Sequence, residues 1–224
     1  MKTLTVLIIG ASRGIGHELA RQYRDDGATV HATVRKEVDA VALRSLGCTV
    51  HHLDVVEAED WQSFGEAIAG SSFDIAIHNA GVSGPRTDGA PTRDAFDETM
   101  RANVWAAMQM APVVGPRVAA VRGKLVVMSS RMGSIGARDV ASHTAYRASK
   151  AAVNSVAKDA ALTFGPDGVT CVAMHPGWVR TDMGGAGADL DVTESVRGIR
   201  KTVDGLSTDD NGCFFSYDGS TMRW

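Results

Sequence analysis

Two side chains that can move a proton stand four residues apart, at Tyr146 and Lys150. Four residues make about one helical turn, so on a helix both side chains would leave the same face. A phenol alone titrates near pH ~10, but an ammonium beside it favours the phenolate and lowers its pKa. The pair could then exchange a proton with a carbonyl or alcohol oxygen at neutral pH. A surface tyrosine and a solvated lysine can show the same spacing by accident, so other features of the sequence must show whether this pair is catalytic.

A glycine-rich turn follows the first apolar run of the chain. The β-branched run at 5–9 predicts a buried parallel strand, and a helix is predicted from Ile15 to Asp26, with Gly27 ending it. Glycines between a strand and a helix let the pyrophosphate of a dinucleotide approach the backbone and the helix N-terminus. We predict a dinucleotide site here rather than a purely structural turn. Its residues are Gly10, Ser12, Arg13, Gly14, Ile15 and Gly16.

The end of the second predicted strand, 28–34, bears on the kind of dinucleotide. An NAD site has a carboxylate there that bonds the ribose 2′-hydroxyl. This sequence has Arg35 and Lys36 instead, with Arg13 nearby in the glycine turn. Cations suit a 2′-phosphate, so we expect NADP(H) rather than NAD(H). The alternative is that Arg35 and Lys36 are solvated surface charges.

Later predicted strands also end in polar or small residues. Asp54 could accept hydrogen bonds from an adenine amine, or cap the helix that begins near Ala58. Asn103 lies within a helix predicted over 93–114, where an asparagine is unfavourable, so it is either a satisfied structural group or a functional one. The remaining strands are predicted at 49–53, 74–77, 124–128, 170–174 and 213–216.

Strands that alternate with helices indicate an α/β protein with a parallel sheet covered on both faces. We expect a Rossmann-type, doubly wound sheet of about seven strands, a three-layer sandwich and a single domain over 1–224. Ligands of such a sheet bind at the carboxyl ends of the strands, where the unusual residues gather. The segment at about 184–206, which begins Gly/Ala-rich, is expected to be a short substrate lid.

Composition limits the other possibilities. The 224 residues carry a formal net charge of -3, with no basic run that would suggest nucleic acid. No apolar segment approaches the ~18 residues of a membrane span, and we interpret the apolar N-terminus as a strand rather than a signal peptide. The three cysteines are far apart and form no CxxC, which favours a reducing cytoplasm and argues against a disulfide framework or a metal site.

Assembled in order, these residues resemble the short-chain dehydrogenase/reductase family from end to end. Within it the chain looks like the small C-factor/sniffer-type carbonyl reductases, because of Tyr146-Arg-Ala-Ser-Lys-Ala-Ala-Val-Asn154, the short chain and the ending Phe214-Phe-Ser-Tyr-Asp-Gly. The elements that carry the family resemblance are the Gly-Ala-Ser-Arg-Gly-Ile-Gly turn, Asp54, Asn79-Ala80-Gly81, Asn103, Ser130, Tyr146-xxx-Lys150 and Pro176-Gly-xxx-Thr181.

The resemblance implies a role for each catalytic residue. Tyr146 would be the acid in reduction and the base in oxidation, and Lys150 would lower its pKa and bond the nicotinamide ribose. Ser130, chosen over Ser129 because Ser-x-x-Gly is the family's local pattern, would bond the substrate oxygen. Asn103 would hold a water that links Lys150 to solvent. Further cofactor contacts are expected at Asp54, Val55, Asn79, Ala80, Gly81, Tyr146, Pro176, Gly177, Val179 and Thr181.

The sequence departs from the family pattern in three places. His78 stands where the family usually has asparagine, and we expect little effect there. Ser130 and Tyr146 are sixteen residues apart, a longer gap than the commonest one, which would reshape the substrate mouth. The segment after Thr181 is short and Gly-rich. Candidates for lining the mouth are Met132, Ile135, Arg138, His143, Trp178 and Met183.

The resulting prediction is an NADP(H)-dependent oxidoreductase that interconverts a carbonyl and an alcohol. The main alternative is a dinucleotide-sensing regulatory or signalling protein that has lost turnover. A related lyase or epimerase would need a longer C-terminal substrate region. We expect a small-molecule substrate and a homo-oligomer, a dimer or tetramer, since the family usually dimerises through the helices that carry Asn103 and Tyr146.

Overall fold

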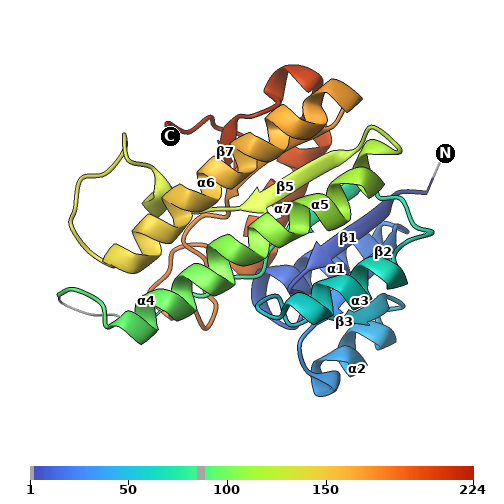
Figure 1. The fold of residues 1–224 in the computed structure, drawn as a ribbon, viewed down its shortest axis with the longest axis horizontal. Helices are drawn as coiled ribbons and strands as arrows, with labels where there is room; N and C mark the ends of the chain where they lie inside the picture. The colour runs from blue at the N-terminus through green and yellow to red at the C-terminus, as the bar shows by residue number, and fades with distance from the viewer. Residues whose placement is uncertain (1–2, 85–88) are drawn as a thin grey trace.

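The computed structural model describes residues 3–84 and 89–224, and its centre is one parallel sheet (Figure 1). The strand order is β3-β2-β1-β4-β5-β6-β7, which confirms the predicted doubly wound α/β fold. Most predicted strand boundaries agree to within a residue with the observed ones. The strands are β1 Thr5–Ile9, β2 Thr29–Val34, β3 Thr49–His52, β4 Ile75–His78, β5 Lys124–Met128, β6 Thr170–His175 and β7 Phe214–Ser216.

Helices cover both faces of the sheet because the central strands are apolar on both sides. Val6 and Ile8 of β1 join one buried cluster, and Leu7 and Ile9 join the other. The first cluster is covered by α1 Gly14–Asp25, α2 Glu37–Ser45 and α7 Val192–Gly205. The second is covered by α3 Ala58–Ala67, α5 Ala106–Ala119 and α6 Thr144–Phe164, of which α5 and α6 lie side by side in front of the sheet in Figure 1.

The helix predicted over 93–114 differs from the observed one in two ways. It consists of α4 Arg93–Met100, a π-helical turn at Arg101–Trp105, and α5, which continues past Pro112 and Pro116 to Ala119. The predicted end is therefore wrong by five residues. The π-helical turn contains Asn103, and such turns are frequent at functional sites. Residues 89–91, which precede α4 in the described part of the chain, are not helical.

Only the first part of the expected lid segment is loop. Val196, Ile199 and Val203 of α7 are fully buried against the sheet, so α7 is part of the core and is not free to move as a lid. The amphipathic spacing of these residues, three and four apart, explains this packing. We therefore replace the expected lid at about 184–206 with a proposed lid at 182–190, which begins two residues earlier and ends before α7.

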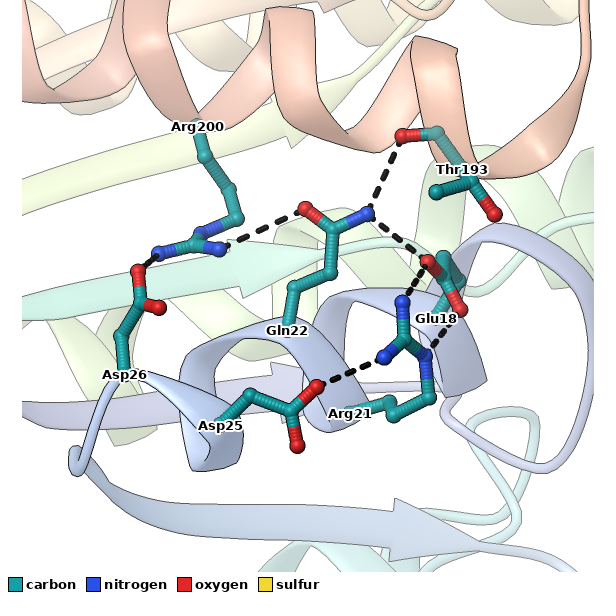
Figure 2. Close-up of polar contacts among 7 residues, drawn as sticks. All are labelled: Glu18, Arg21, Gln22, Asp25, Asp26, Thr193 and Arg200. Atoms are coloured by element: carbon teal, nitrogen blue, oxygen red, sulfur yellow. Dashed lines mark hydrogen bonds and ion pairs between the residues drawn. The ribbon is translucent and has the colours of Figure 1, made fainter.

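A polar network joins α7 to α1 (Figure 2). Gln22, which is buried, donates to the Glu18 carboxylate at 2.7 Å and to the Thr193 carbonyl at 3.0 Å. The Arg21 guanidinium donates two hydrogen bonds to the Glu18 carboxylate, of 2.8 and 2.6 Å. Arg200 of α7 pairs with Asp26 and lies 4.5 Å from the centre of the Tyr23 ring. These contacts fix the start of α7, and so the far end of the proposed lid.

Residues 221–224 return to the sheet after β7. The Met222 amide donates to the Phe214 carbonyl at 2.7 Å, and the Trp224 ring stacks on Phe214 with 5.4 Å between ring centres. The same segment supports the chain after Ser130, because the hydroxyl of Ser134 donates to the Arg223 carbonyl at 2.6 Å. This segment therefore lies between the last strand and the expected substrate mouth.

Candidate active site

The glycine turn lies where the strand order changes direction, between β1 and β4. Gly10 has φ +84°, and a Cβ there would lie 2.8 Å from Ala80 Cα, so only glycine fits. Asn79 donates its side-chain amide to the Gly10 carbonyl at 2.7 Å, and Asn79 and Ala80 both donate their backbone N–H to Ile9. The predicted segments at 10–16 and 79–81 thus form one surface, at the switch point where open α/β sheets bind ligands.

The start of α1 has the properties of an anion site. Its N-cap, Arg13, makes no capping hydrogen bond through its side chain, and no acidic residue lies in the first turn. By contrast α2, α3, α4 and α7 each carry an acidic side chain there. The N–H groups of Gly14, Ile15 and Gly16 therefore meet no competing carboxylate, and they fit the pyrophosphate of a dinucleotide. Ser12 is half-buried beside them.

The expected cations lie at the surface. Arg35 and Lys36 are exposed, and their side chains make no hydrogen bond or ion pair within the described residues, so both cations can meet a phosphate. The carboxylate of the next residue, Glu37, is paired with Arg44. Arg13 instead forms a 2.7 Å ion pair with Asp182, at the start of the proposed lid. It would have to leave that pair to reach a 2′-phosphate.

Asp54 does not cap the next helix, so that interpretation is wrong. The N-cap of α3 is Glu57, while the Asp54 carboxylate accepts from the Val56 amide at 3.3 Å in a local turn. The backbone of Asp54 is held by Asp60 at 2.7 Å, and the Val55 carbonyl by the Trp61 indole at 3.0 Å. Both residues are half-buried, which leaves the adenine role as a proposal.

Tyr146 and Lys150 share one face of α6, as their spacing predicts. Lys150 Nζ lies 5.9 Å from the centre of the Tyr146 ring and donates to the Met128 carbonyl at 2.8 Å. Burial lowers the pKa of Lys150 to about 8, so the amine is still largely charged at neutral pH. Its remaining N–H groups are available to a ligand or to water.

The pKa of Tyr146 in the protein is raised rather than lowered, and its lowering by Lys150 stays a prediction. Burial raises the pKa of the Tyr146 phenol, and a hydrogen bond with the Ser130 side chain offsets only part of that rise. Desolvation of the phenolate is the largest cause of that rise, and Lys150 is itself buried and bonded to the Met128 carbonyl. Sequence spacing gives the placement of the pair but not the desolvation cost.

The choice of Ser130 over Ser129 agrees with the hydrogen bonding. The Ser129 hydroxyl is directed to α6, where it bonds Asn154 and, at 3.4 Å, the Lys150 carbonyl. Ser130 accepts from the Met132 amide at 3.1 Å, and its side chain acts to lower the pKa of the Tyr146 phenol. Gly133 lies so close to α6 that a Cβ there would be 2.6 Å from the carbonyl carbon of Lys150. This contact fixes the Ser130 loop against the helix that carries Tyr146.

Asn103 is a satisfied polar group that joins two parts of the site. Its Oδ1 accepts from the Val82 amide at 2.8 Å, and its Nδ2 donates to the Val82 carbonyl and to Ser149, both at 2.9 Å. Both amide hydrogens are thereby used and one lone pair is left on Oδ1. Gly81 completes the contact, since a Cβ there would lie 2.9 Å from that Oδ1 and 3.5 Å from Lys150 Nζ.

The segment from Pro176 to Thr181 closes the site on the other side. Thr181 lies over the glycine turn, because a Cβ at Gly14 would be 3.4 Å from its Cγ2. Gly177, with φ +88°, makes the turn after β6, and the Pro176 carbonyl accepts from Ser195 of α7 at 2.6 Å. Val179 pairs with Leu190 as an isolated parallel bridge, which closes the 182–190 loop.

Apolar side chains surround the expected substrate mouth. Ile135, Trp178 and Met183 are 71%, 55% and 45% exposed. Met132 and His143 are half-buried, and Arg138 is exposed. His143 begins α6 in the left-handed conformation, with φ +49°. The sequence offers no reason to assign a role to His78, which is buried near Lys150. Its position at the end of β4 is the only feature of the sequence that points to the site.

Comparison with known proteins agrees with this geometry. Residues 10–201 match the family model described as enoyl-(acyl carrier protein) reductase. This chain belongs to the short-chain dehydrogenase/reductase family, a family of oxidoreductases.

Individual relatives match over most or all of the chain. The C-signal of Myxococcus xanthus is 36% identical over 73% of this chain and 99% of its own. Carbonyl reductase Sniffer of D. melanogaster superposes over 100% of both chains with a TM-score of 0.93 and 27% identity. An NADPH-bound carbonyl reductase from chicken fatty liver does so over 100% of both chains with a TM-score of 0.89 and 29% identity.

Among the helices of the described residues, none has the length and apolar content needed to cross a membrane.

Proposed function

We propose that this protein is an NADP(H)-dependent oxidoreductase that interconverts a carbonyl and an alcohol. The observation that carries the proposal is the placement of Tyr146 and Lys150 on one face of α6, with Nζ 5.9 Å from the ring centre, beside Ser130, whose side chain acts to lower the pKa of the phenol. Gly81 lies close to Lys150, its neighbour Ala80 packs on Gly10 of the glycine turn, and the start of α1 after that turn fits a pyrophosphate. The NADPH bound by the chicken relative supports the choice of cofactor.

Each residue of the proposed active site would have its own role in the reaction. NADPH, when bound, supplies the hydride to the carbonyl carbon. Ser130 and Tyr146 bind the carbonyl oxygen, and Tyr146 gives that oxygen its proton. Lys150, charged at neutral pH, stabilises the phenolate left on Tyr146. Asn103 holds Val82 and Ser149 in place and has one lone pair for a water that would return a proton to this site.

Binding of the dinucleotide would use the whole switch-point surface. The glycine turn would take the pyrophosphate, Arg35 the 2′-phosphate, and Asp54 and Val55 the adenine. Asn79, Ala80, Gly81, Pro176, Gly177, Val179 and Thr181 would lie against the nicotinamide half. Residues 182–190 would act as the lid, held at one end by Thr181 and at the other by α7.

A dinucleotide sensor without turnover is the second candidate. The name of the Myxococcus relative, a signal, favours it. The intact arrangement of Ser130, Tyr146 and Lys150 favours the enzyme, because a sensor has no need of a proton donor at this position.

Titration of the purified protein with NADPH and NADH, followed by a panel of ketones and aldehydes, separates these candidates. The reductase should bind NADPH more tightly than NADH and turn over at least one carbonyl. Binding of NADPH without turnover on any carbonyl would favour the sensor. Tighter binding of NADH would show that Arg35 and Lys36 are solvated charges.

We further propose a homo-oligomer that works in the reducing cytoplasm. Two observations support this: Met108 on α5 and Leu162 on α6 are exposed apolar side chains, and Cys48, Cys171 and Cys213 are free. Light scattering coupled to gel filtration, with and without Leu162→Glu, tests the assembly. A monomeric wild-type protein would contradict it.

A further inference from the structure

His78 is the last residue of β4 and is only 2% exposed. Its neighbours in register are Ile9 of β1 and Val127 of β5, which both belong to the cluster under α5 and α6. Residues in register on adjacent strands point to the same face of a sheet. The imidazole therefore lies in the layer between the sheet and α6.

The ammonium of Lys150 enters the same layer from α6. Its Nζ bonds the carbonyl of Met128, the residue that follows Val127 on β5. Gly81, three residues beyond His78, lies close enough that a Cβ there would be 3.5 Å from Nζ. The imidazole and the ammonium therefore lie in the same layer, at the same end of the β4–β5 pair.

Within the described residues, Nε2 of His78 is buried and has no hydrogen-bond partner. A buried polar atom left unpaired costs about 1–3 kcal/mol, so a partner is expected. The nearby side chains are already engaged: Asn103 with Val82 and Ser149, and Ser129 with Asn154. Lys150 is the neighbour with donors to spare, because an ammonium has three N–H groups and one is used on Met128.

We propose that His78 is a positioning residue for Lys150, with Nε2 accepting, through one bridging water, a hydrogen bond from the Lys150 ammonium. A neutral acceptor favours the charged form of the lysine and so opposes the effect of burial. The consequence for catalysis rests on the proposed function; the contact itself does not.

The ionisation of the group is consistent with this role. Burial and the charge of Lys150 lower the pKa of His78 to about 3, so the imidazole is neutral wherever Lys150 titrates. Tyr146 is the other titratable side chain facing Lys150, and the remaining polar neighbours, Asn103, Ser129 and Asn154, do not ionise. His78 is therefore a fixed acceptor and not a proton carrier.

Kinetics with His78→Leu and His78→Asn test the catalytic consequence. Without an acceptor, Lys150 loses its proton at lower pH, so the upper limb of the pH profile of kcat for carbonyl reduction should move down by roughly 0.5 pH unit or more. His78→Asn keeps an acceptor oxygen and should restore about half of that shift or more, while KM for NADPH stays within about twofold in both variants. A pH profile of His78→Leu that matches the wild type would overturn the proposal.

Nitrogen NMR of the imidazole tests the contact without any need for turnover. In the wild type, Nε2 should have the shift of a hydrogen-bonded acceptor, and in Lys150→Met that shift should be lost and the pKa of His78 should rise by about one unit or more. Ring nitrogens that do not respond to Lys150→Met would refute the contact even if the enzyme is active. If the ring nitrogens respond but the protein turns over no carbonyl, the His78–Lys150 contact is supported and the proposed reductase function is rejected. This measurement also decides the matter if His78→Leu fails to fold.

Discussion

The Ser129 hydroxyl donates to Oδ1 of Asn154 on α6, so the two adjacent serines at the end of β5 have different partners. Successive side chains on an extended chain point to opposite sides, which places Ser129 under α6 and Ser130 beside Tyr146. One serine therefore fastens the helix to the sheet, and the other is available to a substrate oxygen.

Alanine at each serine should separate these roles. Ser129→Ala leaves a buried amide oxygen unpaired, so it should lower the free energy of unfolding by about 1–2 kcal/mol and change turnover little. Ser130→Ala should lower kcat for carbonyl reduction by roughly 10²-fold with little loss of stability. Urea unfolding and steady-state kinetics on both variants are the measurements. The reverse pattern would exchange the two assignments.

Tyr146→Phe removes the proposed proton donor and keeps the ring. We expect turnover to fall by roughly 10²-fold or more, while NADPH still binds, because the phenol hydroxyl moves the proton and the rest of the switch-point surface still holds the dinucleotide. Fluorescence titration measures the binding and a carbonyl assay the turnover. Near-wild-type turnover would remove Tyr146 from the mechanism.

Arg35→Asp reverses the charge expected to meet a 2′-phosphate. It should weaken NADPH binding far more than NADH binding, by about tenfold or more, because only NADPH carries that phosphate. Arg197→Asp, at another exposed arginine on α7, makes the same charge change away from the site and is the matched control. An equal loss of both dinucleotides in Arg35→Asp would place the phosphate elsewhere.

Glu18 should make stability depend on pH. Its hydrogen bond with Arg21 holds its pKa at about 2, below the 4.5 of an ordinary glutamate, so its contribution is full above pH 4.5 and is lost as the pH falls toward 2. We expect Glu18→Gln to cost about 1–2 kcal/mol at neutral pH and much less at low pH, where the wild-type carboxyl is also protonated. Urea unfolding across that range measures it. A cost independent of pH would show that packing, and not charge, is lost.

The sequence predicted those parts of the molecule that depend on local pattern. Apolar β-branched runs gave the strands, and the four-residue spacing placed Tyr146 and Lys150 on one helical face. The glycine turn could be predicted because its glycines need a positive φ or lie against a neighbouring backbone, as Gly10 does against Ala80.

Other features depend on contacts between distant parts of the chain and were missed for that reason. The burial of α7 needs α1 and the sheet as partners, so its sequence alone resembled a lid. The raised pKa of Tyr146 reflects desolvation by the whole fold. The π-helical turn contains Asn103, whose side-chain amide bonds Val82 and Ser149. Helix propensities do not include such contacts with distant residues.

The return of residues 221–224 along β7 also bears on self-association. β7 is the edge strand of the sheet, and an uncovered edge offers free N–H and C=O groups to a strand of another molecule. Here Phe214 and Phe215 are already paired with Met222 and Thr221 in antiparallel fashion, and Trp224 covers the ring of Phe214. The final residues therefore protect the protein against aggregation by strand addition at this edge, in addition to supporting the loop after Ser130.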